Sequence, residues 1–286
     1  MIKKIITTLF CLLSILIVCS QERHEISVSA SGGLSSINYS PYIGQSSNKN
    51  GNTIGIGYNY RITDSWSIGS GIELLIMKSG YNVENASDSY VANDGEDNFI
   101  FNTTLEAYSE SQNISYLNIP IVMMFQHPIA GRNNFYALAG FRFGIPVQQQ
   151  VDINASFNSY GYYPKWENPI KDNPYFMGFG NFESINEKGS IELKALYSLS
   201  IESGMKWGLG DKLNLYSGVF CDYGLNNIKQ KTNKRLIQYN IIEPTEYIHN
   251  SVINSSFSNE DNSTRQLVDN VRVISVGLRL RLALNL

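Results

Sequence analysis

The chain has 286 residues and a formal net charge of −3, or −5 without Lys3 and Lys4, which lie in the N-terminal leader. A mildly acidic chain lacks the basic surface that binds nucleic acid, so we expect no nucleic-acid partner. Charged residues make up only 16% of the sequence, against about 25% in ordinary soluble domains. A single domain is expected at this length.

Residues 1–20 have the pattern of a secretory signal peptide. Two lysines precede an apolar run over residues 5–18, and small or polar residues follow up to Ser20, after which we expect cleavage. The run is shorter than the roughly 20 residues that a membrane-spanning helix needs. The sequence therefore predicts an exported protein without a helical anchor.

An alternative is processing as a lipoprotein with Cys19 acylated, but Val18 is bulky for the position before such a cysteine. With cleavage after Ser20, the mature chain, residues 21–286, keeps a single cysteine, Cys221, and forms no internal disulfide. In either case residues 21–286 are expected to form one domain.

Eight segments alternate apolar and polar residues with the period of two that is typical of β-strands. The last segment is the most regular, because leucines occupy one face while Arg279 and Arg281 lie on the other. Each segment is long enough for a tilted strand to cross a bilayer, which takes about 9–11 residues. The eight segments are 24–32, 53–62, 66–78, 114–126, 135–148, 191–207, 213–224 and 271–286.

The connections between these segments alternate between long and short, at about 20, 3, 35, 8, 42, 5 and 46 residues. Transmembrane barrels have short periplasmic turns and long extracellular loops, with both chain ends in the periplasm. The sequence therefore predicts an all-β protein, an eight-stranded antiparallel up-and-down transmembrane β-barrel with four long extracellular loops in a Gram-negative outer membrane. A lipocalin-like soluble barrel is the alternative, but it predicts an outer face rich in Lys and Glu.

The central hairpin carries a resemblance to a known family. Residues 116–122 (YLNIPIV), followed by a turn and residues 135–140 (FYALAG), resemble the PorT-type outer-membrane β-barrel family. Gly55, Gly57 and Tyr58 of the second segment and the terminal strand extend the resemblance loosely over the mature chain. It implies an outer-membrane barrel, with a link to protein secretion through the founding member.

Charged residues of both signs fall on the polar faces of four segments: Glu73, Arg142, Glu202, Arg279 and Arg281. The interior of an eight-stranded barrel is just wide enough for side chains to fill it. We therefore expect these residues to form an ion cluster that plugs the lumen. The alternative is that they are solvated by lumen water.

The third long connection is rich in aromatic residues, interspersed with Gly, Pro and Asn. Exposed aromatic side chains are typical of recognition surfaces. They also favour a packed lid over the barrel mouth, which would fix an otherwise mobile loop. The candidate residues are Phe157, Tyr160, Tyr162, Tyr163, Trp166, Tyr175 and Phe176.

Catalytic motifs are absent from the sequence, which has no GxSxG, HExxH or CxxC. His249, with Ser251 and Glu246 nearby, is the one candidate for a lipid hydrolase. We expect no enzyme, metal or cofactor, but a structural or interaction protein with surface-exposed binding loops. A transport or secretion-associated pore is the second hypothesis. Expected partners are outer-membrane lipid, the barrel-assembly machinery and an unknown surface or protein partner of the loops.

Overall fold

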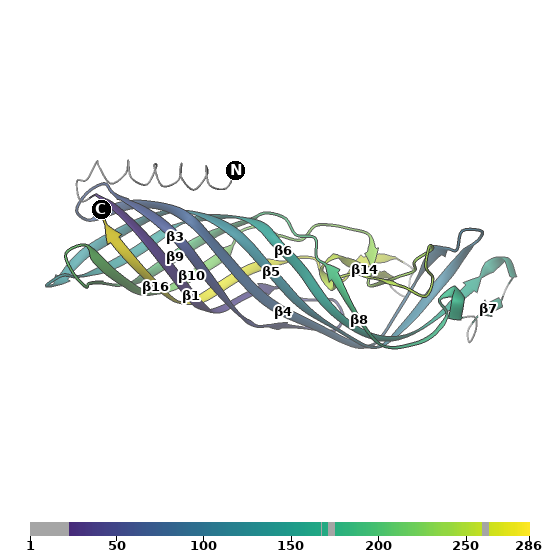
Figure 1. Ribbon diagram of the computed structural model, residues 1–286. Coiled ribbons are helices and arrows are strands. Elements are labelled where there is room, and N and C mark those ends of the chain that lie inside the picture. The colour runs from purple at the N-terminus through teal and green to yellow at the C-terminus, as the bar shows by residue number, and fades with distance from the viewer. Residues whose placement is uncertain (1–22, 167, 171–174, 259–262) are drawn as a thin grey trace, which may run out of the picture.

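A computed structural model describes residues 23–166, 168–170, 175–258 and 263–286 (Figure 1). Strands dominate the elements of this part of the chain, and short 3-10 turns are its only helices. None of these helices is long and apolar enough to cross a membrane. The predicted all-β class is confirmed, and the predicted signal peptide lies outside the described residues.

Eight long strands form the main sheet, and all their pairings are antiparallel. They follow one another in the order β4-β3-β1-β16-β10-β9-β6-β5, and β5 also pairs with β4. The first and last strands are neighbours, with Glu25 opposite Asn285, so the start of β1 and the end of β16 lie at the same end of the sheet. The strands are β1 (His24–Asn38), β3 (Asn50–Arg61), β4 (Trp66–Asn93), β5 (Asn98–Ala130), β6 (Asn133–Tyr163), β9 (Leu196–Gly208), β10 (Leu213–Gly224) and β16 (Arg272–Asn285).

The proximal section, the part of the sheet nearest the chain ends, has an apolar outside and a polar inside. On β16, Leu278 and Leu280 are exposed, whereas Arg279 and Arg281 are buried. The same inversion recurs on the other strands because successive side chains of a strand point to opposite faces. This arrangement is the reverse of a soluble fold.

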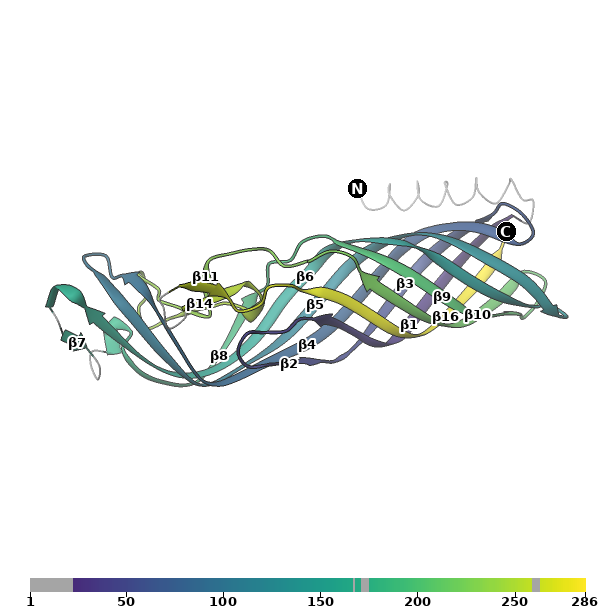
Figure 2. The same cartoon turned by 180° about the vertical axis from the view of Figure 1, so that it is seen from behind.

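The sheet continues far beyond the proximal section on three strands (Figure 2). Strands β4, β5 and β6 are 28, 33 and 31 residues long. The expectation of a long loop over residues 79–113 is wrong, because these residues extend β4 and β5 up to a turn at 94–97. Their outward positions carry Ser, Asn and Glu in place of apolar residues, so the pattern is weaker there.

This distal section has a hydrophobic core of its own. The described residues of the connection from β10 to β16, 225–258 and 263–271 (called the 225–271 segment below), lie against the inner side of β4, β5 and β6 (Figure 1). Buried aromatic and aliphatic residues, among them Phe101, Phe157 and Ile253, join the two parts. The fourth expected loop is thus a packed part of the fold and not a free extracellular loop.

Short elements complete the distal section. Strand β8 pairs with β6, and β2 pairs with β4. The remaining ones are β7 on β6 and the small sheets of the 225–271 segment. Their bounds are β2 (Gln45–Asn48), β7 (Asn168–Ile170), β8 (Gly180–Ser190), β11 (Lys234–Arg235), β12 (Ile237–Gln238), β13 (Ile248–His249), β14 (Ser255–Ser258) and β15 (Thr264–Gln266), with 3-10 turns Pro164–Trp166, Tyr175–Met177 and Val252–Asn254.

Candidate functional site

The interior of the proximal section holds a network of buried ion pairs. Arg142, from β6, places Nε 2.8 Å from Glu73 Oε2 on β4. Its Nη1 lies 2.5 Å from Asp222 Oδ1 on β10. Arg279 Nη2, on β16, lies 3.7 Å from the other oxygen of Asp222. One aspartate therefore connects two arginines that come from opposite parts of the sheet.

Glu202, on β9, is the second acceptor of this network. It lies 2.8 Å from Arg279 Nη1 and 3.1 Å from Arg281 Nη2. The Tyr136 hydroxyl donates to its carboxylate at 2.8 Å. The structure thus brings all five charged residues singled out in the sequence into one cluster.

Asp222 is the member of the cluster that the sequence analysis missed. It lies on the inward face of β10 together with Tyr216 and Phe220, from which it is separated by an even number of residues along the strand. That period of two, applied to β10 as it was to β16, would have found it. With Asp222 the cluster has three acidic and three basic groups, so its formal charges balance.

Further polar groups and two small cavities lie among the other inward side chains of the proximal section. Near the chain ends, Lys206 Nζ lies 3.6 Å from Glu25 Oε2, which also accepts a hydrogen bond from the Tyr216 hydroxyl at 2.8 Å. Two cavities among the inward side chains measure only about 30 and 10 Å³. A water molecule needs at least roughly 10–15 Å³, so each of these cavities has room for about one or two water molecules.

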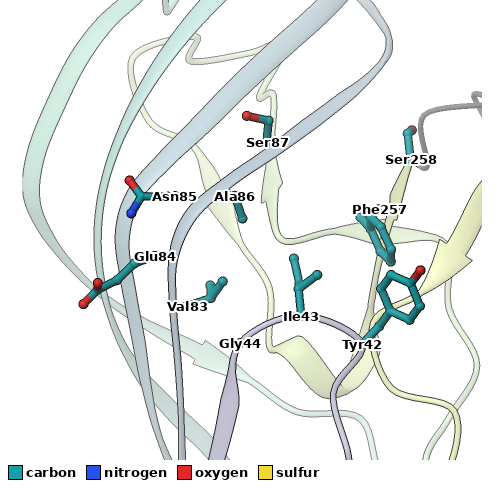
Figure 3. Close-up of a pocket in the computed structure, with 10 residues that line it drawn as sticks. All are labelled: Tyr42, Ile43, Gly44, Val83, Glu84, Asn85, Ala86, Ser87, Phe257 and Ser258. Atoms are coloured by element: carbon teal, nitrogen blue, oxygen red, sulfur yellow. The ribbon is translucent and has the colours of Figure 1, made fainter.

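A cleft of the distal section lies beside β4 (Figure 3). Its volume is about 810 Å³. Val83 and Ala86 of β4 face Ile43, Tyr42 and the ring of Phe257 across it, while Glu84 and Asn85 point to the opposite side of β4. The Tyr42 and Phe257 rings stack at 5.2 Å.

A glycine shapes the wall of this cleft. Gly44 has φ of +73°, and a Cβ there would lie 2.5 Å from the carbonyl oxygen of Asn82. Only glycine adopts this close, left-handed turn without strain. It lets residues 41–44 turn away from β4, so that the chain lines the cleft and does not pair with β4.

Comparison with known families now adds to this geometry. The family described as outer membrane protein beta-barrel domain matches residues 19–230. The chain belongs to this family. Membership indicates the cell outer membrane as its location, and the narrower PorT-type assignment stays a prediction. No curated protein matches the chain.

Two solved structures of bacterial outer-membrane proteins are similar to this family member. One is the attachment invasion locus protein Ail of Yersinia pestis, solved in complex with the heparin analogue sucrose octasulfate, at 10% identity and a TM-score of 0.29. The match covers 91% of this chain and 99% of Ail. The other is OprG of Pseudomonas aeruginosa, at 12% identity and a TM-score of 0.32, covering 91% and 95% of the two chains.

The aromatic residues of the third connection separate into three groups by their exposure in this barrel protein. Phe157 and Tyr163 are buried in the distal core, which excludes them as free recognition residues, and Tyr160 and Tyr162 are half-buried. The exposed group is Trp166, Tyr175 and Phe176, at 64%, 58% and 72%.

The hydrolase candidate has no catalytic geometry. Burial lowers the pKa of His249 to about 4, and among the described residues its Nδ1 has no hydrogen-bond partner. The Ser251 hydroxyl donates to Glu110 and not to the histidine. A catalytic triad needs the serine, histidine and acid in hydrogen-bond contact, and these residues lack it.

Glu110 anchors the 225–271 segment in the distal core. Its carboxylate accepts hydrogen bonds from the Ser251 hydroxyl at 2.5 Å, the Val252 amide at 2.9 Å and the Gln112 side chain at 2.8 Å. The Tyr108 hydroxyl donates to it at 3.2 Å. No cation among the described residues forms an ion pair with it.

We expect Glu110 to make the distal section sensitive to pH. Burial raises its pKa above the ordinary 4.5, so its stabilising contribution is present below that value and is lost as the pH rises through the folded-state pKa. Hydrogen exchange around Val252, corrected for intrinsic rates, should therefore be faster at pH 7 than near pH 5. Glu110→Gln should remove this pH dependence. It should also lower the stability of the distal section by about 1–3 kcal/mol, because one carboxylate oxygen that accepts hydrogen bonds is replaced by an amide group that donates them. The same dependence in the variant would contradict the assignment.

Proposed function

We propose that the protein is a non-enzymatic outer-membrane binding protein, with a plugged barrel as anchor and the distal section as a rigid extracellular platform. The observation that supports this best is the continuous core between the three long strands and residues 225–271. A chain that only had to stay in the membrane would need no such core outside it. Binding sites held by packed elements are more precise than sites on loops.

The membrane position follows from the outer surface of the proximal section. Its outward side chains are apolar and exposed, with Leu278 at 66%, Ile121 at 62% and Phe141 at 61%. Exposed apolar surface this extensive is unfavourable in water and suits lipid. We propose that the eight long strands form a transmembrane barrel, with the chain ends in the periplasm and the distal section outside the cell.

The binding surface we propose lies at the far end of the platform. Trp166 and Phe176, which lie on either side of β7 in the chain, are exposed, and Figure 1 shows β7 at this far end. The Tyr247 hydroxyl donates to the Gly178 carbonyl oxygen, which brings the loop that exposes Ile242 at 85% close to Phe176. Aromatic residues are enriched at protein interfaces because they bury a large area when a partner covers them. The ion cluster inside the barrel argues against the pore hypothesis.

The test is site-specific photo-cross-linking in intact cells. A photoreactive amino acid at Trp166 or Phe176 should give a discrete cross-linked species, and an epitope tag in the 94–97 turn should be reached by antibody. The control is Asp211, which is 90% exposed at the opposite end and should give neither. Surface access at Asp211 but not at the 94–97 turn would reverse the orientation. Absence of cross-links at both aromatic positions would contradict the binding role.

A further inference from the structure

One edge of β4 lacks a partner strand in the distal section. Strand β3 covers β4 up to Ile76, and β2 covers it from Ser79 to Asn82. From Val83 to Asn93, β5 is the only strand that pairs with β4 in the described part of the chain. In an antiparallel strand alternate residues direct both N–H and C=O to the same side, so about half of these groups point away from β5.

The unpaired edge coincides with two clefts. The 810 Å³ cleft of Figure 3 is lined by residues 83–87, and a second of about 610 Å³ by residues 90–93. Between them, Ser258 bridges to β4, with its amide 2.8 Å from Asp88 Oδ1 and its hydroxyl 2.5 Å from the Ser89 carbonyl oxygen. On either side of this bridge, no strand of the described residues pairs with the edge.

Exposed strand edges are a hazard that natural proteins usually block with proline, lysine or a covering element. Residues 83–93 (VENASDSYVAN) contain neither proline nor lysine. The one irregularity is Asn85, whose φ of 54° twists the edge. Besides Asn85, the charged residues Glu84 and Asp88 are the only features of residues 83–93 that protect strand edges in other proteins. An unpaired edge beside a cleft with an apolar side, here Val83, Ala86, Ile43 and Phe257, is the arrangement used by domains that bind peptides by strand addition.

We propose that residues 83–87 of β4 bind an extended segment of a partner protein as an added strand. The backbone of β4 supplies the hydrogen bonds, and the apolar cleft between Val83, Ala86, Ile43 and Phe257 receives alternate side chains of the segment. The twist at Asn85 limits the ladder, so the segment is short and has apolar residues at every second position. This inference rests on the proposed binding function and names the chemistry of its partner.

The test uses the purified full-length protein in detergent micelles and a panel of labelled six-residue peptides that alternate Thr with Val, Ile or Phe. We expect at least one peptide to bind by fluorescence polarisation and to slow hydrogen exchange at residues 83–87. N-methylation of alternate amides, which removes about two backbone hydrogen bonds, should weaken that binding about tenfold. Failure of the whole panel to bind would overturn the proposal.

Protein variants separate the edge from other surfaces. Ala86→Trp fills the cleft, and Tyr42→Ala, at an exposed position that tolerates change, removes its wall. Both should abolish or strongly weaken binding. The control is Asn154→Trp, an exposed position on β6, which pairs with β5 and β8 on its two sides and should bind normally. Equal binding of the N-methylated peptide, or binding without protection at residues 83–87, would overturn strand addition. This experiment uses purified protein, whereas the cross-linking experiment uses intact cells. If the peptides do not bind but the surface cross-links form, strand addition at β4 is wrong and the proposed binding function stands.

Discussion

Replacing Glu202 with alanine is expected to lower the free energy of unfolding by about 3–5 kcal/mol, because it leaves buried charge unpaired. Glu202 accepts from Arg279, Arg281 and the Tyr136 hydroxyl in the interior of the proximal section. After the change Arg279 still has Asp222 at 3.7 Å. Among the described residues Arg281 forms an ion pair with Glu202 alone, so it bears most of the loss.

A second substitution then tests whether the cluster acts as a unit. Arg281→Ala in the Glu202→Ala chain should restore part of the stability, since it removes the charge that lost its partner. The matched control is Asp211→Ala, which breaks an exposed pair with Arg132 and should cost at most about 1 kcal/mol. Denaturant unfolding in micelles measures all of these variants. Additive losses in the double variant, or steady single-channel conductance of the wild-type barrel, would contradict the plug.

The proximal section is predictable from sequence because its surroundings impose one rule on every strand. Lipid outside and a narrow polar lumen inside require strict alternation, and Leu278, Arg279, Leu280 and Arg281 follow it without error. The same rule placed Glu73 and Glu202 inside. The rule located all eight long strands. The predicted ends differ from the observed ends where a strand continues beyond its apolar outer face.

The distal section was not predictable because its strands have a different environment. Their outward faces meet water and their inner faces meet residues 225–271, which are distant in sequence. Ser79 and Glu110 point inward there: the Ser79 hydroxyl donates to Gln112, and the Glu110 carboxylate accepts from Ser251, Val252, Gln112 and Tyr108. Polar residues at core positions weaken the alternation of apolar and polar residues by which strands are recognised. The sequence near them does not indicate which residues they bind. The free edge of β4 depends on where β2 ends, which is equally a tertiary property.

Replacing Phe101 with alanine is expected to destabilise the distal section selectively. Phe101 is fully buried, with its ring 5.6 Å from that of Tyr90, 5.5 Å from that of Tyr239 and 5.9 Å from that of Tyr247. Removing a buried phenyl ring costs about 3–5 kcal/mol, which combines lost burial with the cavity left behind. Limited proteolysis should then cleave within residues 225–271. A closed barrel that resists detergent is expected to migrate differently on a gel before and after boiling, and we expect the variant to show this shift as the wild type does.

The matched control for this change is Phe176→Ala, the same substitution at a position that is 72% exposed. It removes no core contact, so proteolysis should resemble that of the wild type, whereas cross-linking at Trp166 should weaken if both residues contact one partner. Phe101→Ala should weaken the same cross-linking indirectly, because the platform that positions these residues opens. If both variants resisted protease equally, residues 225–271 would not need the aromatic core to hold them against β4, β5 and β6, and the rigid-platform argument would lose its basis. Selective cleavage of the Phe101 variant with an intact barrel would show that the distal section gains its stability from its own core, separately from the charged plug beneath it.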